Sequence, residues 1–156
     1  MKFNFVFLGQ SVLRYEVPLD IFNAINRIYE NNFQQLPAAN KQLVGKIMDE
    51  KSIFYDGDDE TKMKRFSLLP ANVHQWFLSM YDHYLKWNGI RNYKTHLNSI
   101  WINEMKANEY NPVHVHQGNL YTGLSSVMIL KTPSTYGQEY SAEGQPQNGK
   151  LQILGS

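Results

Sequence analysis

Cysteine is absent from this chain. Its absence excludes disulfide bonds and thiolate metal sites, and it leaves histidine and carboxylate as the only strong metal ligands. Long apolar runs are absent too, because no stretch reaches the roughly 18 consecutive apolar residues that indicate a membrane-spanning helix. Any metal chemistry must therefore depend on the 5 histidines and the 14 acidic residues.

An excess of charge of one sign is also missing. The 15 Lys and Arg residues nearly balance the acidic ones, the net charge is +1, and the basic residues form no run. Domains that bind nucleic acid usually carry a basic patch or stripe, so we expect no nucleic-acid partner. The apolar tract of residues 1–8 is broken by Asn4 and lacks the apolar core of about 7–15 residues that a signal peptide has. We interpret this tract as a strand and expect a cytoplasmic protein with no membrane partner.

Helices are predicted in the first part of the chain, which at 156 residues has the length of a single domain. Apolar residues recur at helical spacing in residues 19–31 and 70–86, and a proline stands at the start of each stretch. A further helix is predicted over residues 38–48. Strands are predicted later in the chain, because residues 93–105 alternate in polarity and residues 124–130 form a second apolar run.

The strongest functional signal lies in residues 108–121, and His114 and His116 are at its centre. Side chains two residues apart on a strand point the same way, roughly 6.6 Å apart at the backbone. Two imidazoles at that separation can reach one metal ion, since each bond is about 2.0–2.1 Å long. Pro112, the neighbouring valines and the turn-like residues 117–119 favour a strand over a helix here. The pair therefore indicates a metal site, although two histidines can also simply share a half-buried face.

Two families place a His-x-His pair on a strand of a barrel-like fold. A cupin would follow the pair with a glutamate three or four residues later, where this chain has Leu120 and Tyr121. The sequence instead resembles the 2-oxoglutarate/iron(II) oxygenases, in particular the predicted oxygenases common in marine cyanophages, and the resemblance covers roughly residues 94–154. Ser126 stands where that family commonly has glycine. The sequence motifs that carry the resemblance are Trp101-Ile-Asn103, Tyr110-Asn-Pro-Val-His-Val-His116 and Leu124-Ser-Ser-Val127.

The resemblance implies an α+β protein whose core is a double-stranded β-helix, or jelly roll, with N-terminal helices packed on one sheet. Residues 1–156 would form a single oxygenase-like domain, with a helical N-terminal part at 1–92 and the first strands of the core at 93–156. The implied function is a 2-oxoglutarate- and iron(II)-dependent dioxygenase of the hydroxylase type, encoded by a phage and acting in the host cytoplasm. Iron(II) would be its metal and 2-oxoglutarate its co-substrate, while the primary substrate is left open.

The resemblance also assigns roles to single residues. In that family three protein ligands on one side of the iron leave positions open for the co-substrate and dioxygen. His114 would be the family's first histidine, and His116 takes the place that aspartate has in the commoner His-x-Asp arrangement, which removes one negative charge from the site. Four polar residues are expected to line the co-substrate pocket on proximity alone: Asn103, Tyr110, Tyr121 and Ser125.

Two further groups that the resemblance implies are not found in the chain. The family has a distal histidine ligand, and an arginine or lysine that binds the far carboxylate of 2-oxoglutarate, on later strands. Here no histidine follows His116 and no arginine follows Arg91. We therefore expect the core to be incomplete at its C-terminus, so that residues 1–156 alone do not convert 2-oxoglutarate to succinate. The free strand edge of such a core could pair with a second copy in a homo-oligomer.

Two alternative functions stay open. The first is a cupin-like metal-binding protein, and the second is a non-catalytic phage structural or interaction protein, which an aromatic-rich, nearly neutral domain would suit. Bound metal would distinguish the first from the second, and 2-oxoglutarate binding would distinguish an oxygenase from a cupin. A cupin-like protein would take its third ligand from one of four residues: His96, Glu104, Glu139 or Glu143.

Overall fold

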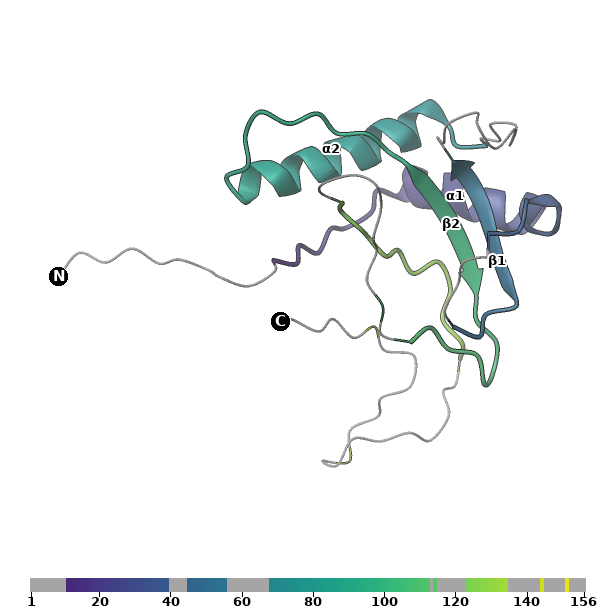
Figure 1. The fold of residues 1–156 in the computed structure, drawn as a ribbon. Helices are drawn as coiled ribbons and strands as arrows, with labels where there is room; N and C mark the ends of the chain where they lie inside the picture. Colours follow the sequence, from purple (N-terminus) through teal and green to yellow (C-terminus); the bar gives the residue numbers. More distant parts are fainter. Residues whose placement is uncertain are drawn as a thin grey trace, which may run out of the picture. The chain divides into compact units, whose positions relative to one another are not determined.

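The computed structural model describes residues 11–39, 45–55, 68–112, 114, 123–134, 144 and 151. The chain divides into two compact units, Glu16–Ser126 and Met1–Tyr15 with Val127–Ser156. Every helix and strand among the described residues belongs to the first unit. In chain order these are α1 (Leu19–Asn32), the 3-10 helix η1 (Phe33–Gln35), β1 (Asp49–Tyr55), α2 (Ala71–Trp87) and β2 (Ser99–Glu104) (Figure 1).

Helix α1 confirms the helix predicted over residues 19–31. It begins directly after Pro18, and Asp20 in its first turn is placed favourably for the helix dipole. Its buried residues recur at intervals of four and three, which puts them on one face of the helix. That face is the contribution of α1 to the core: Ile21, Ile25 and Ile28.

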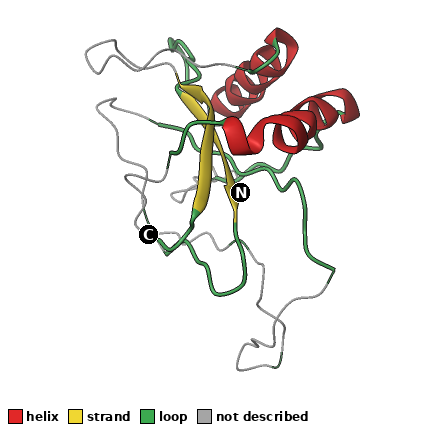
Figure 2. Ribbon diagram, turned by 90° about the vertical axis from the view of Figure 1, so that its right-hand side faces the viewer, coloured by secondary structure: helices red, strands yellow, loops and turns green. Residues whose placement is uncertain are grey.

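Helix α2 confirms the helix predicted over residues 70–86. Pro70 precedes it, and Asn88 ends it by donating its side-chain amide to the carbonyl oxygen of Tyr84 at 2.8 Å. Val73, Phe77 and Leu85 are its buried residues. Both helices lie to one side of the two strands (Figure 2). Within the described ranges, no helix combines the length and the apolar character that crossing a membrane requires.

The two strands form an antiparallel pair whose register assigns residues to its two faces. Phe54 pairs with Ile100, and its ring centroid lies 5.7 Å from that of His74 on α2. This face is therefore the helix side of the sheet. Ile102 alternates with Ile100 onto the same side and is buried. By the same alternation Trp101, which is exposed, lies on the opposite face.

The helix predicted over residues 38–48 is wrong for the part of it that is described, residues 38–39 and 45–48. Ala38 forms an isolated antiparallel bridge with Lys51, and Lys46 forms one with Tyr110. The backbone of this stretch is thus bonded to other segments, and that pairing overrides its local helical preference. Ile47 is buried as the predicted apolar face required, although it lies outside any helix.

The strand predictions were only partly correct. Strand β2 occupies the second half of the stretch predicted at 93–105, whereas β1 was not predicted at all. The described residues 124–130 carry no assigned strand. The strand predicted at residues 1–8 lies outside the described residues. The jelly-roll core stays a prediction.

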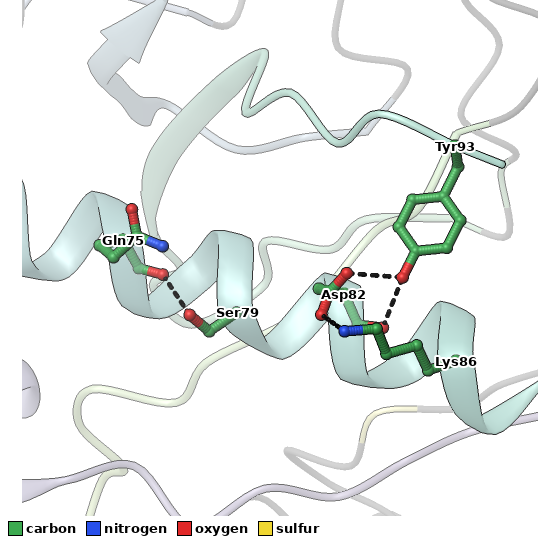
Figure 3. A network of polar contacts seen from close by, with 5 residues as sticks. All are labelled: Gln75, Ser79, Asp82, Lys86 and Tyr93. Carbon is green, nitrogen blue, oxygen red and sulfur yellow. Dashed lines mark hydrogen bonds and ion pairs between the residues drawn. The ribbon is translucent and has the colours of Figure 1, made fainter. Parts of the chain in front are cut away.

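A polar network fastens the connection between α2 and β2 to the helix (Figure 3). The Tyr93 hydroxyl donates to Oδ1 of Asp82 at 2.5 Å, and Lys86 Nζ lies 2.6 Å from Oδ2 of the same carboxylate. The hydrogen bond from Lys86, followed by that from Tyr93, lowers the pKa of Asp82. The connection is thereby tied to α2 at Tyr93, six residues before β2 begins.

Lys86→Ala and Tyr93→Phe should each raise the pKa of Asp82 toward its ordinary value, because each removes a hydrogen bond to the ionised carboxylate. The effect of Lys86→Ala should be larger, since that bond contributes most. Carboxyl ¹³C shifts followed against pH measure the change. Ser79→Ala is the matched control, because its hydroxyl bonds the Gln75 carbonyl on the same helix at 2.9 Å (Figure 3).

The sign of the pH dependence follows from the lowered pKa. The stabilisation from these bonds is present above the ordinary pKa of aspartate and is lost as pH falls through the pKa in the folded protein. Both variants should therefore approach wild-type stability in acid. An Asp82 pKa that does not move in Lys86→Ala would contradict the network.

Candidate metal site

The segment that carries His114 is fastened beside β1 by backbone hydrogen bonds. The Lys46 N–H donates to the Tyr110 carbonyl at 2.9 Å, and the Tyr110 N–H donates to the Lys46 carbonyl at 3.1 Å. This bridge continues the β1–β2 pairing past its last pair, Asp49 with Glu104. The bridge thereby positions Tyr110, which lies four residues before His114 in the chain.

A polar turn connects β2 to this bridge. The Glu109 carboxylate accepts the backbone N–H of Lys106 at 2.8 Å and that of Met48 at 3.2 Å. The Lys106 ammonium lies 2.6 Å from Oδ2 of Asp49 and lowers the pKa of that carboxyl. Asn108 adopts a left-handed conformation with φ 64°, which asparagine tolerates better than most residues. Residues 105–109 thus form a turn with internal and cross-strand support.

Glycine at position 45 permits the two backbones to approach. A Cβ atom there would lie 2.9 Å from Cδ of Pro112, 3.0 Å from Cα of Asn111, and closer still to the carbonyl oxygen of Tyr110. Two of these three atoms are backbone, which cannot rotate away as a side chain could. The position of the histidine-bearing segment therefore depends on the missing side chain of Gly45.

The ring of His114 is oriented by its own backbone. Its Nδ1 lies 2.7 Å from the carbonyl oxygen of Pro112, and because a carbonyl only accepts, Nδ1 carries the proton and donates. The lone pair of the neutral ring is then on Nε2. Histidines that bind metals nearly always donate their other ring N–H to a carbonyl, carboxylate or water, so this arrangement suits a ligand. The residue is exposed. His116, its predicted partner, lies outside the described residues.

A buried carboxylate lies within electrostatic reach of this ring. Glu50 on β1 is only 7% exposed, and its Oε2 has no hydrogen-bond partner among the described residues. Burial raises the pKa of Glu50, and the nearby imidazole of His114 lowers it. Buried carboxylates are usually paired or hydrogen-bonded, so this oxygen calls for an explanation. Sequence reasoning missed Glu50, because the run Asp49–Lys51 gives no sign that its middle residue faces inward.

One of the predicted pocket residues, Asn103, lies across the strand pair from this carboxylate. Asn103 pairs with Glu50 across the sheet, so both side chains lie on the face away from the helices. It is exposed, as is Tyr110 on the segment leading to His114. Ser125 is exposed and precedes Ser126, whose hydroxyl lies 2.8 Å from that of Tyr81 on α2. Tyr121 lies outside the described residues.

Of the ligands considered for a cupin-like site, Glu104 is the one that the strand register places relative to Glu50. Glu104 lies one residue beyond Asn103 and so points to the opposite face of the sheet. His96 lies before β2 and is exposed, while Glu139 and Glu143 are outside the described residues. Within the described part of the chain, no three histidine, aspartate or glutamate side chains are grouped so that they could hold a metal. Glu50 and His114 are two candidate ligands, and a third is needed.

Comparisons of the chain with protein-family models, with curated proteins and with solved structures gave no match.

Gly45→Ala should lower the free energy of unfolding by about 1–3 kcal/mol, the usual cost of adding a methyl group where there is no room. Denaturant-induced unfolding measures this difference. Gly123→Ala is the matched control, because a Cβ there meets no described atom within 4 Å. If both variants were equally stable, the close approach at Gly45 would not support the site.

Proposed function

We propose that this chain is an iron(II)-binding protein of the 2-oxoglutarate-dependent dioxygenase class, with His114 and His116 as metal ligands. The observation that carries the proposal is the His114 ring, whose Nδ1–H is tied to the Pro112 carbonyl in the way that orients histidine ligands of metals. The sequence supplies the second imidazole two residues later.

The donor chemistry fits iron(II). Imidazole nitrogen with carboxylate oxygen is the ligand set of non-haem iron sites, and a chain without cysteine offers no thiolate to favour copper(I) or an iron–sulfur cluster. Oε2 of Glu50 is buried with no hydrogen-bond partner in the described part of the chain, and His114 acts on this carboxyl electrostatically, which supports a bound cation because a positive charge would stabilise the carboxylate. Bound iron would supply the activation of dioxygen for oxidation of a substrate.

Two exposed polar side chains are suited to bind the co-substrate 2-oxoglutarate. Asn103 presents an exposed amide on the same face of the sheet as Glu50, where its N–H₂ can donate to a carboxylate of 2-oxoglutarate. The Tyr110 hydroxyl, on the segment that leads to His114, is a second exposed donor. These groups would orient 2-oxoglutarate, while His114 holds the metal.

Replacing either histidine should remove most of the iron. After anaerobic loading with iron(II) and gel filtration, elemental analysis of His114→Ala and of His116→Ala should show retention reduced about tenfold or more. Losing even a residue that only orients a ligand costs roughly 10–100-fold in metal affinity, and a lost ligand costs at least as much. His83→Ala, an exposed histidine on α2, is the control and should retain iron like the wild type.

Two results would contradict this proposal. Undiminished iron in the variant lacking both histidines would place the metal elsewhere in the chain. Equal binding of 2-oxoglutarate by the metal-free and iron-loaded proteins, measured by equilibrium dialysis, would show that the co-substrate does not bind at the metal and would favour a cupin-like metal protein.

A further inference from the structure

We propose that Glu50 is a metal ligand, donating its carboxylate from β1 to the same ion as His114. The inference rests on the proposed function for the presence of the metal. It goes beyond that function because it assigns a ligand far earlier in the chain than the two histidines. It also differs from the sequence-based expectation, in which the third ligand is a distal histidine.

Burial is the first argument. Only 7% of Glu50 is exposed, and its Oε2 has no hydrogen-bond partner in the described parts of the chain. Taking an ionised carboxylate out of water costs several kcal/mol unless it is paired, and proteins keep such groups where a cation or a metal ion balances them. The His114 imidazole acts on Glu50 electrostatically and lowers the pKa of its carboxyl, against the raising effect of burial.

The second argument is that the neighbouring carboxylates have partners within the protein. Asp49 is paired with the Lys106 ammonium, and Glu109 accepts two backbone N–H groups. Both have structural roles that account for their positions. Glu50 is the carboxylate at this end of the sheet with a buried oxygen for which the described residues provide no such role.

Rigidity of the backbone at Glu50 is the third argument. The Glu50 carbonyl oxygen accepts the N–H of Ala39 at 2.9 Å on one edge of β1. On the other edge, Glu50 is the register partner of Asn103 on β2. A residue on a strand bonded along both edges is held in place more firmly than one on a loop. Metal ligands need such support, because affinity depends on preset geometry. His114 is positioned in turn by the bridge between Lys46 and Tyr110.

The test compares Glu50→Gln with wild type by iron(II) retention and by the rise in unfolding temperature that added iron(II) causes. Glutamine keeps the size of the side chain but loses its charge, so retention should fall about tenfold or more and the temperature rise should be clearly smaller. The metal-free variant should be at least as stable as the metal-free wild type, because an uncharged amide replaces a buried carboxylate whose Oε2 has no hydrogen-bond partner among the described residues. Glu104→Gln, on the opposite face of the same sheet, is the matched control and should behave like the wild type.

The outcomes separate this inference from the proposed function. Wild-type retention in Glu50→Gln, together with loss in His114→Ala, would overturn the role of Glu50 and leave the metal site standing. A wild type that retains no iron would overturn both.

A second measurement covers the case in which Glu50→Gln does not fold. In the wild type, the carboxyl ¹³C resonance of Glu50, assigned with Glu50→Asp, is followed during addition of zinc(II). A ligand carboxyl should shift up to stoichiometric zinc in the wild type and stay unchanged in His114→Ala. An unmoved resonance in a wild type that binds zinc through His114 would overturn the proposal.

Discussion

Hydrogen bonding along both edges of β1 is the constraint on which the rest of the candidate site depends. On one edge, Ala39 N–H and the Pro37 carbonyl bond to β1, and on the other edge β2 pairs with it. The ladder then extends to the bridge between Lys46 and Tyr110. Because this bridge needs Gly45 to pass close to the other backbone, a residue without chemistry of its own determines where the histidine-bearing segment lies.

The two helices were predictable because their signals are local. Burial of Ile21, Ile25 and Ile28 follows directly from their spacing, and the same holds for Val73 and Phe77 on α2. Local spacing failed for residues 38–48, where partners far along the chain supply the hydrogen bonds. It failed also for β1, since a strand that begins with three charged residues shows little alternation of polarity.

The candidate site divides in the same way. The His-x-His spacing is local, so it could be found from the sequence, and the orientation of the His114 ring agrees with it without testing His116. Asn103 was chosen for closeness to the histidines along the chain, and the structure places it across from Glu50. Glu50 itself could not be found, because its relation to His114 arises only when the strand pairing brings together segments distant in sequence.

The charge of the donor set connects the two proposals. A histidine at position 116, where the family resembled by the sequence commonly has aspartate, removes one negative charge from the protein ligands. A carboxylate from Glu50 would restore it, giving two neutral imidazoles and one anionic oxygen around a divalent ion, a set that suits non-haem iron(II). Without the ion, Oε2 of the same carboxylate is buried with no hydrogen-bond partner among the described residues, which disfavours the metal-free fold. Metal binding and folding should then be coupled, since the ion stabilises in the folded chain a charge that the unfolded chain leaves to water.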